Sequence, residues 1–390
     1  MADDTATRIL EYVRNNQDDL IRLLKRMVDA ESPSSSPDTH QLIISVLEEA
    51  LTSLGLVVVH PRAPNAHRHI FARRQGRTRH TPAQLLVGHY DTVWPIGTTA
   101  QRPFSIDENI IRGPGVFDMK GGLTQIVFAL RAIQELDLAI PLEPIIFINS
   151  DEEIGSRSST RYIRALAQCA DRAFVLEPSM GEDGALKTER KGIGRFTVTV
   201  HGKAAHAGLD PEGGASAILE LSHVIQTLFA LNDADKGITV NVGTIDGGLQ
   251  PNVIAPHSQA VIDVRVPTVA DGDRIETAIH ELQPTTPGVR LSVTGGIGRP
   301  SMEKTPRNEA LWSQAKQLGC DLGLDLQQCR AGGGSDGNTT SQYTATLDGL
   351  GPVGHGAHAE HEFLYIDKTL ERTALLALLL LAPSTTGESS

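Results

Sequence analysis

The amino-acid sequence predicts an α/β protein in which a large domain built on a mixed sheet contains a smaller, inserted α/β domain. Three observations predict this fold. The 390 residues exceed what one hydrophobic core usually organises, so we expect two domains. Short apolar runs alternate with helical stretches in the first half of the chain and again near its end, as in an α/β sheet. Between 195 and 295 the predicted elements instead follow the order β-α-β-β-α-β, which is the ferredoxin-like pattern.

The large domain begins with helical periodicity over 5–31 and 40–54, the second stretch following the cap and turn residues "SSSPDTH". Buried strands and helices then alternate. The predicted strands are "LLVG" (85–88), "PIIFINS" (144–150) and "RAFVLEP" (172–178), and the predicted helices are 121–136, 159–170, 308–319 and a buried terminal helix with "ALLALLLLA" (374–382).

The inserted domain is predicted from a strand with alternating polarity and five elements after it. In chain order these are a strand at 195–202, a helix at 215–231, strands at 238–245 and 259–267, a helix at 272–282 and a strand at 289–295. Gly-rich, polar segments flank it, "TERKGIG" before and "GGIGRPSME" after. We therefore expect one domain from 1–190 with 299–390, a second from 191–298, and a hinge at the two connections.

Composition excludes several classes of protein. The formal charge of −12 argues against a nucleic-acid-binding surface. No apolar run approaches the ~20 residues of a membrane span. The acidic, amphipathic N-terminus does not resemble a signal peptide, and the three cysteines form no C-x-x-C pair. These features predict a cytoplasmic protein that binds neither nucleic acid nor membrane.

Polar and ionisable residues follow the predicted strands or lie in Gly-rich loops at five places. These are "GHYD" (88–91), "GPGVFDMKGG" (113–122), "SDEEIGS" (150–156), "LEPS" (176–179) and "GHGAHAEHEF" (354–363). Each alone is ordinary, since a histidine after a strand is usually a hydrogen-bonded core residue and paired acids are usually solvated. Together they indicate a ligand site, because ligands bind at the carboxyl ends of strands in open α/β sheets.

Two histidines and three carboxylates at one sheet edge suit Zn²⁺ or a similar divalent cation. Five ligands are too many for one open catalytic site, and they suit two cations that share one carboxylate with a water between them. His89 and Asp91 are two residues apart, so Asp91 is expected to accept a hydrogen bond from the second ring nitrogen of His89.

The segment "SDEEIGS" separates two roles. Glu152 and Glu153 reach one site only if the chain turns there, which Gly155 and the serines permit. One carboxylate can then bind a cation while the other, free, acts as the general base. Two cations, three carboxylates and one hydroxide leave the site near neutral, so it can accept charge on a carbonyl oxygen.

Other chemistries lack their motifs. "GPGVFDMKGG" does not fit the phosphate-binding P-loop, and "AGGGSDGN" (331–338) lacks the dinucleotide-binding spacing. No G-x-S-x-G element of a serine hydrolase is present. A nucleotide-dependent enzyme is therefore disfavoured.

The motif set resembles the zinc-dependent peptidases and deacylases that include glutamate carboxypeptidase, aminoacylase, acetylornithine deacetylase and succinyl-diaminopimelate desuccinylase. The resemblance extends over nearly the whole chain and is strongest to the glutamate carboxypeptidase branch, because "LEPS" has Glu where some branches have Asp. It implies metal ligands at His89, Asp118 (bridging), Glu153, Glu177 and His358, and a general base at Glu152. Residues His355, His358 and His361 are spaced by three, and the resemblance alone selects His358. It also implies a cis peptide bond between Asp118 and Met119.

The inserted domain resembles the family's lid and dimerisation domain. The resemblance implies that His206 in "GKAAHAG" enters the partner's active site and polarises the scissile carbonyl, whereas a helix-capping loop histidine is the alternative. It implies that Asn252 and Arg265 bind the substrate's terminal carboxylate, and that backbone near Gly333 approaches the same substrate.

These expectations describe a homodimeric hydrolase with two Zn²⁺ per chain, for which Co²⁺ or Mn²⁺ could substitute. It would cleave the amide of a small peptide or an N-acyl amino acid, with a metal-bridging water as nucleophile. The alternatives are an N-acyl-amino-acid deacylase rather than a peptidase, and a catalytically silent, metal-bound binding protein.

Overall fold

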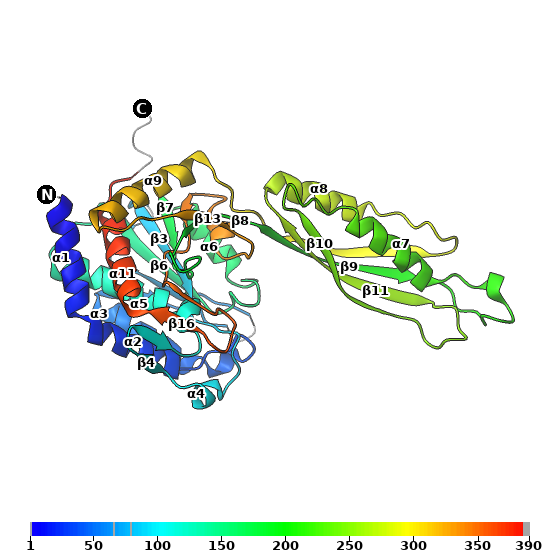
Figure 1. Cartoon of the computed structure of the whole chain (residues 1–390), viewed down its shortest axis with the longest axis horizontal. Helices are drawn as coiled ribbons and strands as arrows, with labels where there is room; N and C mark the ends of the chain where they lie inside the picture. The colour runs from blue at the N-terminus through cyan, green and yellow to red at the C-terminus, as the bar shows by residue number, and fades with distance from the viewer. Residues whose placement is uncertain (1, 65–66, 79, 385–390) are drawn as a thin grey trace. The chain divides into compact units, whose positions relative to one another are not determined.

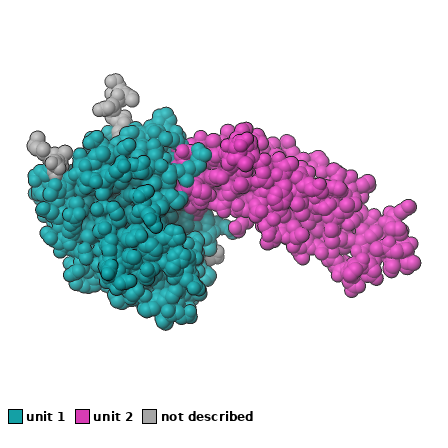
Figure 2. Space-filling view, in the orientation of Figure 1, with its two compact units in different colours: residues 1–188, 304–330, 335–390 teal, residues 189–303, 331–334 magenta. Residues whose placement is uncertain are grey.

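A computed structural model describes residues 2–64, 67–78 and 80–384, and these fall into two compact units (Figures 1 and 2). The first unit comprises the described residues up to Thr188, Lys304–Arg330 and those from Ser335 onward. The second comprises Glu189–Glu303 and the short loop Ala331–Gly334. The smaller unit is thus an insertion into the larger one.

A six-stranded mixed sheet forms the centre of the first unit. Its order is β1 (Leu56–Val59), β2 (Ile70–Arg74), β6 (Glu143–Asn149), β3 (Ala83–His89), β7 (Arg172–Val175) and β14 (Ala345–Leu347). The strands β6, β3, β7 and β14 are parallel, whereas β2 runs antiparallel to both of its neighbours, β1 and β6. The carboxyl ends of β6, β3 and β7 therefore meet at one edge, as the sequence predicted for an α/β sheet.

Helices cover both faces of this sheet, as Figure 1 shows for the layer containing α5 and α11. The helices are α1 (Ala2–Asn15), α2 (Gln17–Asp29), α3 (Gln41–Ser53), α4 (Thr98–Gln101), α5 (Gly121–Glu135), α6 (Thr160–Ala167), α9 (Pro306–Asp321), α10 (Gly337–Thr340) and α11 (Ile366–Leu381). Leu86 of β3 packs into the core of α1, α2, α3, α5 and α11. Its neighbours Leu85 and Val87 pack with α6 on the other face, which is the alternation expected of a strand buried on both sides.

Two differences from the predicted elements matter. The stretch 5–31 forms two helices, because the chain breaks at Asn16, whose side-chain amide donates to the carbonyl of Tyr12. A second sheet was not predicted. It has the order β15 (Gly354–His355), β16 (Phe363–Tyr365), β5 (Ile110–Arg112) and β4 (Ser105–Asp107), and a further pair joins β8 (Leu186–Arg190) to β13 (Gln328–Ala331).

The second unit has the predicted β-α-β-β-α-β order. Its elements are β9 (Gly192–His201), α7 (Ala217–Phe229), β10 (Thr239–Gly247), β11 (His257–Val266), α8 (Val269–His280) and β12 (Arg290–Arg299). The antiparallel sheet has the order β10-β11-β9-β12, and both helices lie on one face of it (Figure 1). Phe196, Val198 and Val200 of β9 alternate into the core beneath these helices. This topology is the ferredoxin-like arrangement.

Among the described residues, no helix is both long and apolar enough to cross a membrane.

Candidate metal centre and active site

Three neighbouring parallel strands end beside the predicted metal ligands. His89 is the last residue of β3, Glu153 lies in the turn after β6, and Glu177 follows β7. Asp118 lies in the segment before α5, and His358 in the hairpin between β15 and β16. Strands about 4.8 Å apart hold their terminal side chains within reach of one another, so the sheet itself assembles the site.

The side chains of these five residues converge. Nε2 of His89 lies 3.3 Å from Oδ1 of Asp118 and 3.6 Å from Oε1 of Glu177. Nε2 of His358 lies 3.4 Å from Oδ2 of Asp118 and 2.9 Å from Oε2 of Glu153. Asp118 thus directs one carboxylate oxygen toward each imidazole, as a carboxylate that bridges two cations must.

Two buried atoms here lack a hydrogen-bond partner among the described residues, Nε2 of His89 and Oδ1 of Asp118. Leaving a buried polar group unpaired costs about 1–3 kcal/mol, so such groups normally have a function or a missing ligand. The oxygens and nitrogens of His89, Asp118 and Glu153, and of His89, Glu152 and Glu177, form two sets whose atoms lie within 4.8 Å of one another. Nitrogen and carboxylate donors in this arrangement fit divalent cations such as Zn²⁺.

The electrostatics of the cluster favour added positive charge. Hydrogen bonds to Asp118 and Glu153 raise the pKa of His358 to about 10. Burial raises the pKa of Glu153 to about 7, and the nearby Asp118 carboxylate adds to this effect. Burial alone would raise the pKa of Asp118, yet the two imidazoles lower it overall. Protons and cations therefore compete for these ligands.

The predicted turn after β6 is present, and Asp91 organises it. Its carboxylate accepts hydrogen bonds from the backbone amides of Glu152 and Glu153, both at 3.2 Å, and from Oγ of Ser34 at 2.7 Å. Gly155 has a φ of 96°, which closes the turn. Both glutamates thus face one site, as their proposed roles require.

His89 was expected to donate a hydrogen bond to the carboxylate of Asp91, but in the structure the acceptor is the main-chain carbonyl of Asp91. Nδ1 of His89 lies 3.0 Å from the main-chain carbonyl of Asp91 but 3.5 Å from its Oδ1. The chain leaves β3 at His89, so the two side chains do not share a strand face. The carbonyl serves the predicted purpose, since a proton held on Nδ1 leaves Nε2 as the ligand atom.

Glu362 was not predicted as a site residue, although it is almost fully buried (2% exposed). Its Oε1 accepts from the amides of Phe117 and Asp118, both at 3.0 Å. Its Oε2 accepts from the amide of Gly115 at 2.8 Å and from Nε1 of Trp94 at 3.1 Å. Glu362 therefore connects the His358 hairpin to the loop of Asp118, where the implied cis peptide bond to Met119 is present. The available signal was a glutamate in the same short motif as His358.

In the inserted unit, His206 and Asn252 are neighbours. His206 pairs with Val253 in an isolated bridge, and the amide of Ala207 donates to the carbonyl of Asn252 at 3.0 Å. Nδ1 of His206 accepts from the amides of Gly208 and Leu209, both at 3.2 Å. In the neutral ring of this exposed residue the proton is then on Nε2, which makes that nitrogen the donor.

Arg265 lies at the other end of β11 from Asn252. The eight steps along β11 from His257 to Arg265 span about 27 Å at about 3.4 Å per residue, so one chain does not bring Arg265 and Asn252 to one carboxylate. Arg265 donates from Nε and Nη2 to Asp263 at 2.9 and 3.2 Å, which orients its guanidinium. The carbonyl of Gly333 accepts from Nη1 of Arg190 at 3.1 Å, and a Cβ built on Gly333 would meet no atom within 4 Å.

Comparisons with known proteins relate the chain to peptidases and amidohydrolases. Residues 188–285 match the M20 peptidase dimerisation domain. Carboxypeptidase G2 from Pseudomonas sp. (strain RS-16) is 27% identical over 387 residues, covering 96% of this chain and 91% of that protein. N-formyl-4-amino-5-aminomethyl-2-methylpyrimidine deformylase from Halalkalibacterium halodurans is 27% identical over 288 residues, covering 66% of this chain and 65% of that protein.

A solved structure has the same fold. The YXEP protein of Bacillus subtilis, described as a dinuclear metal-binding peptidase from the M20 family, has a TM-score of 0.65 at 13% identity and covers 94% of this chain and 98% of its own. Residues 188–285 thus match the dimerisation domain of the M20 peptidases, nearly the whole chain is similar to a carboxypeptidase, and the chain is an enzyme of the metallopeptidase and amidohydrolase class.

Proposed function

We propose that the chain is a dinuclear zinc hydrolase that removes an α-amino acid with a free carboxylate from a small peptide or an N-acyl amino acid. One observation supports this most directly. The two oxygens of Asp118 are directed toward two different imidazoles, each with a further carboxylate beside it. Two cations in this cluster would have His89 and Glu177, and His358 and Glu153, as their separate ligands, with Asp118 shared.

When bound, the cations would polarise the scissile carbonyl and lower the pKa of the attacking water. Glu152 stands in the turn with Glu153 but is not needed as one of the five ligands. Its carboxylate takes a proton from the water and then delivers it to the leaving amine. Asp91 holds the backbone of both glutamates, so it positions the base without touching the substrate.

The substrate carboxylate pairs with Arg265, whose planar fork of donors suits it. The pair with Asp263 uses Nε and Nη2 of Arg265, so Nη1 is the donor that we assign to this contact. Because Asn252 and His206 are at the opposite end of β11, we assign both to the partner subunit. Nε2–H of His206 then donates to the carbonyl oxygen as negative charge develops on it.

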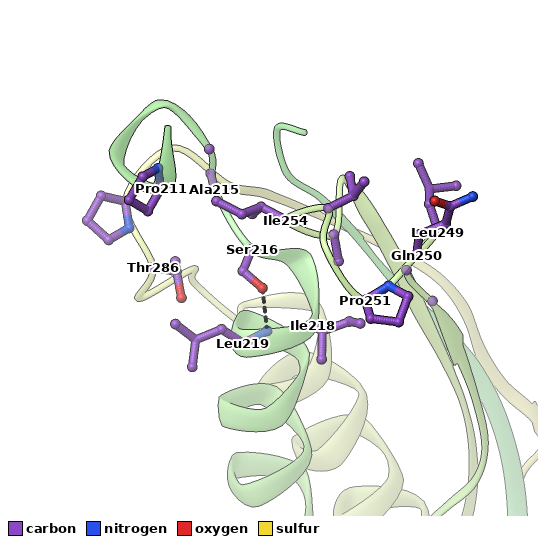
Figure 3. A pocket seen from close by; sticks show the side chains of 16 residues that line it. Pro211, Ala215, Ser216, Ile218, Leu219, Leu249, Gln250, Pro251, Ile254 and Thr286 are labelled. Atoms are coloured by element: carbon purple, nitrogen blue, oxygen red, sulfur yellow. Dashed lines mark hydrogen bonds between the residues drawn. The ribbon is translucent and has the colours of Figure 1, made fainter. Parts of the chain in front are cut away.

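A homodimer formed through the lid would supply these residues. The second unit exposes large apolar side chains, among them Leu209 (83%), Leu249 (70%) and Ile245 (66%). Leu249 also lines a groove of about 820 Å³. The start of α7 and the loop with Gln250 and Pro251, immediately before Asn252, border this groove (Figure 3). Apolar surface of this kind marks protein interaction sites.

We further propose that residues 191–298 close over the substrate by a hinge at their two connections, which would exclude water from the reaction. All three cysteines are free, which supports a reducing, cytoplasmic location. The deformylase relative keeps an N-acyl-amino-acid deacylase as the second candidate.

The test is release of free amino acid from a panel of dipeptides, tripeptides and N-acyl amino acids by Zn²⁺- or Co²⁺-loaded protein, with Glu152→Ala as the control. Cleavage by the wild type, and none by a variant that still binds two cations, would support the mechanism, and the panel would separate peptidase from deacylase. If the wild type and Glu152→Ala both bind two cations and neither cleaves any substrate, the hypothesis of a catalytically silent binding protein is favoured.

A further inference from the structure

The segment from 60 to 80 has an unusual charge for this acidic protein. It contains six arginines and four histidines but no aspartate or glutamate, whereas the whole chain has a formal charge of −12. None of these residues belongs to the metal cluster or to its supports described above. The described residues of the segment include those of the β1–β2 connection and all of β2.

The strand register places the start of this segment at the catalytic edge of the sheet. Ile70, the first residue of β2, pairs with Ile148 of β6, and Val59 at the end of β1 pairs with Phe71. On the other side of β6, His89 pairs with Asn149. The described residues next to the end of β1 and the start of β2 therefore lie at the same edge as the metal ligands.

A groove of about 510 Å³ lies at this point. Four basic side chains from the segment line it, His60, Arg62, His67 and Arg68, and Asp38 is its one acidic lining residue within the described part of the chain. Glu48, at 2.6 Å from His60, compensates only that histidine. We call these four residues and the space they border the basic groove.

The guanidinium groups of the basic groove are not neutralised. Arg68 donates to the neutral side chain of Gln41, and among the residues described neither Arg62 nor Arg68 has a carboxylate within ion-pair distance. A third guanidinium is adjacent, since Nη2 of Arg161 donates to the carbonyl of Arg62 at 2.7 Å. Uncompensated guanidinium groups that line a concave surface are suited to bind a carboxylate.

The basic groove is joined directly to the catalytic turns. Nδ1 of His67 lies 3.3 Å from Oγ of Ser150, two residues before Glu152. The hydroxyl of Tyr90, the residue after His89, donates to the carbonyl of Arg68 at 2.7 Å. From β3 the groove is two to three strand spacings away, about 10–14 Å, which three to four residues of extended peptide would span.

We propose that the basic groove is a subsite for a carboxylate on the acyl side of the substrate, three to four residues from the scissile amide. The inference rests on the proposed hydrolase function and adds a substrate class, namely short peptides with an acidic residue distant from the cleaved end. Arg62 and Arg68 would be the specificity-determining residues. Because both are exposed, the selectivity is modest and decreases as salt is added.

The test compares two blocked pentapeptides that differ only in glutamate or glutamine at the first residue. The initial rate of release of the last residue is measured for wild type, Arg62→Gln/Arg68→Gln and Arg74→Gln. Arg74 is the matched control, because it is on β2 at the opposite sheet edge and pairs with Glu143. We expect the wild type and Arg74→Gln to have a KM about three- to tenfold lower for the glutamate peptide, and the double variant to have equal values.

Binding of the same peptides to the Glu152→Ala protein by calorimetry makes the result independent of turnover. If the protein binds the glutamate peptide more tightly and the double variant loses this preference, the result supports the basic groove as a carboxylate subsite. This holds even if no peptide is cleaved, and absence of cleavage would then contradict only the proposed hydrolase function. Equal binding of both peptides, or a preference that the double variant retains, overturns the inference whatever the catalytic result.

Discussion

Replacing Glu362 by glutamine tests whether one buried carboxylate sets the geometry of the metal site. The substitution keeps the shape of the side chain but exchanges one acceptor oxygen for an NH₂ donor. Each oxygen of Glu362 accepts two hydrogen bonds, from Phe117 and Asp118 on one side and from Gly115 and Trp94 on the other. In either orientation of the amide, two N–H groups therefore lose their acceptor and face another donor.

The size of the effect follows from this count. A buried donor left without an acceptor costs about 1–3 kcal/mol, so two of them cost about 2–6 kcal/mol, less whatever the loop recovers by moving. A loss of this size lowers the Tm of a domain of this length by roughly 5–10 °C. A displaced loop also moves Asp118 and the hairpin of His358 apart, and loss of such supporting contacts typically weakens cation binding about 10- to 100-fold.

Two measurements check this reasoning, the Tm of metal-free protein and a Co²⁺ titration followed by its visible absorption. Glu360→Gln is the control, because it makes the same change at an exposed position of the same hairpin. We expect Glu362→Gln to melt several degrees lower and to bind at least one cation more weakly, and Glu360→Gln to match the wild type. A Glu362→Gln protein that melts with the control and binds two cations with wild-type affinity would refute the argument.

Three further results are expected. Burial lowers the pKa of His69 to about 4 from about 6.5 in the unfolded chain, so the unfolded state binds more protons between these values. About 3 kcal/mol of stability is then lost as pH falls from 6.5 to 4. The free energy of unfolding in urea should therefore differ less between pH 7 and pH 5 for His69→Asn than for the wild type. Asp91→Ala frees the amides of both glutamates in the catalytic turn, so kcat should fall about 10- to 100-fold while the protein stays folded by circular dichroism. If His206 acts in trans, mixed dimers of the inactive variants Glu152→Ala and His206→Ala should regain activity. One of the two sites then has both an intact Glu152 and an intact His206 from the other subunit. Verified mixed dimers that stay inactive would instead place His206 in cis.

Much of the fold was predictable from the sequence, because its strongest signals are local. The strands of the large sheet are continuous apolar runs, and those of the inserted domain alternate in polarity, so both periodicities are visible. The second sheet has strands of only two or three residues, which are too short to show a period. The break at Asn16 was missed because the apolar face continues from α1 into α2.

The choice among three histidines shows what the sequence alone could not decide. His355, His358 and His361 have equal spacing, and composition treats them alike. In the structure Nδ1 of His355 and Nε2 of His361 lie 3.1 Å apart, and their rings stack. His358 instead has a φ of 60° and lies next to Asp118 and Glu153. The backbone conformation of the hairpin, which no periodicity reports, separates the ligand from the pair.

Glu362 was beyond sequence reasoning for a different reason. A ligand at the end of a strand is noticeable because it is a polar residue after an apolar run. Glu362 instead acts through backbone and indole N–H groups that are 244 to 268 residues away in the chain. Every residue except proline has a backbone amide, so the sequence does not indicate which amides a distant carboxylate will contact. It connects the loop of the shared ligand Asp118 to the hairpin of His358, so the two cations of the proposed site depend on one buried carboxylate that binds neither. The residues that hold a metal can be found by their chemistry, whereas those that hold its ligands are found only by the contacts they make.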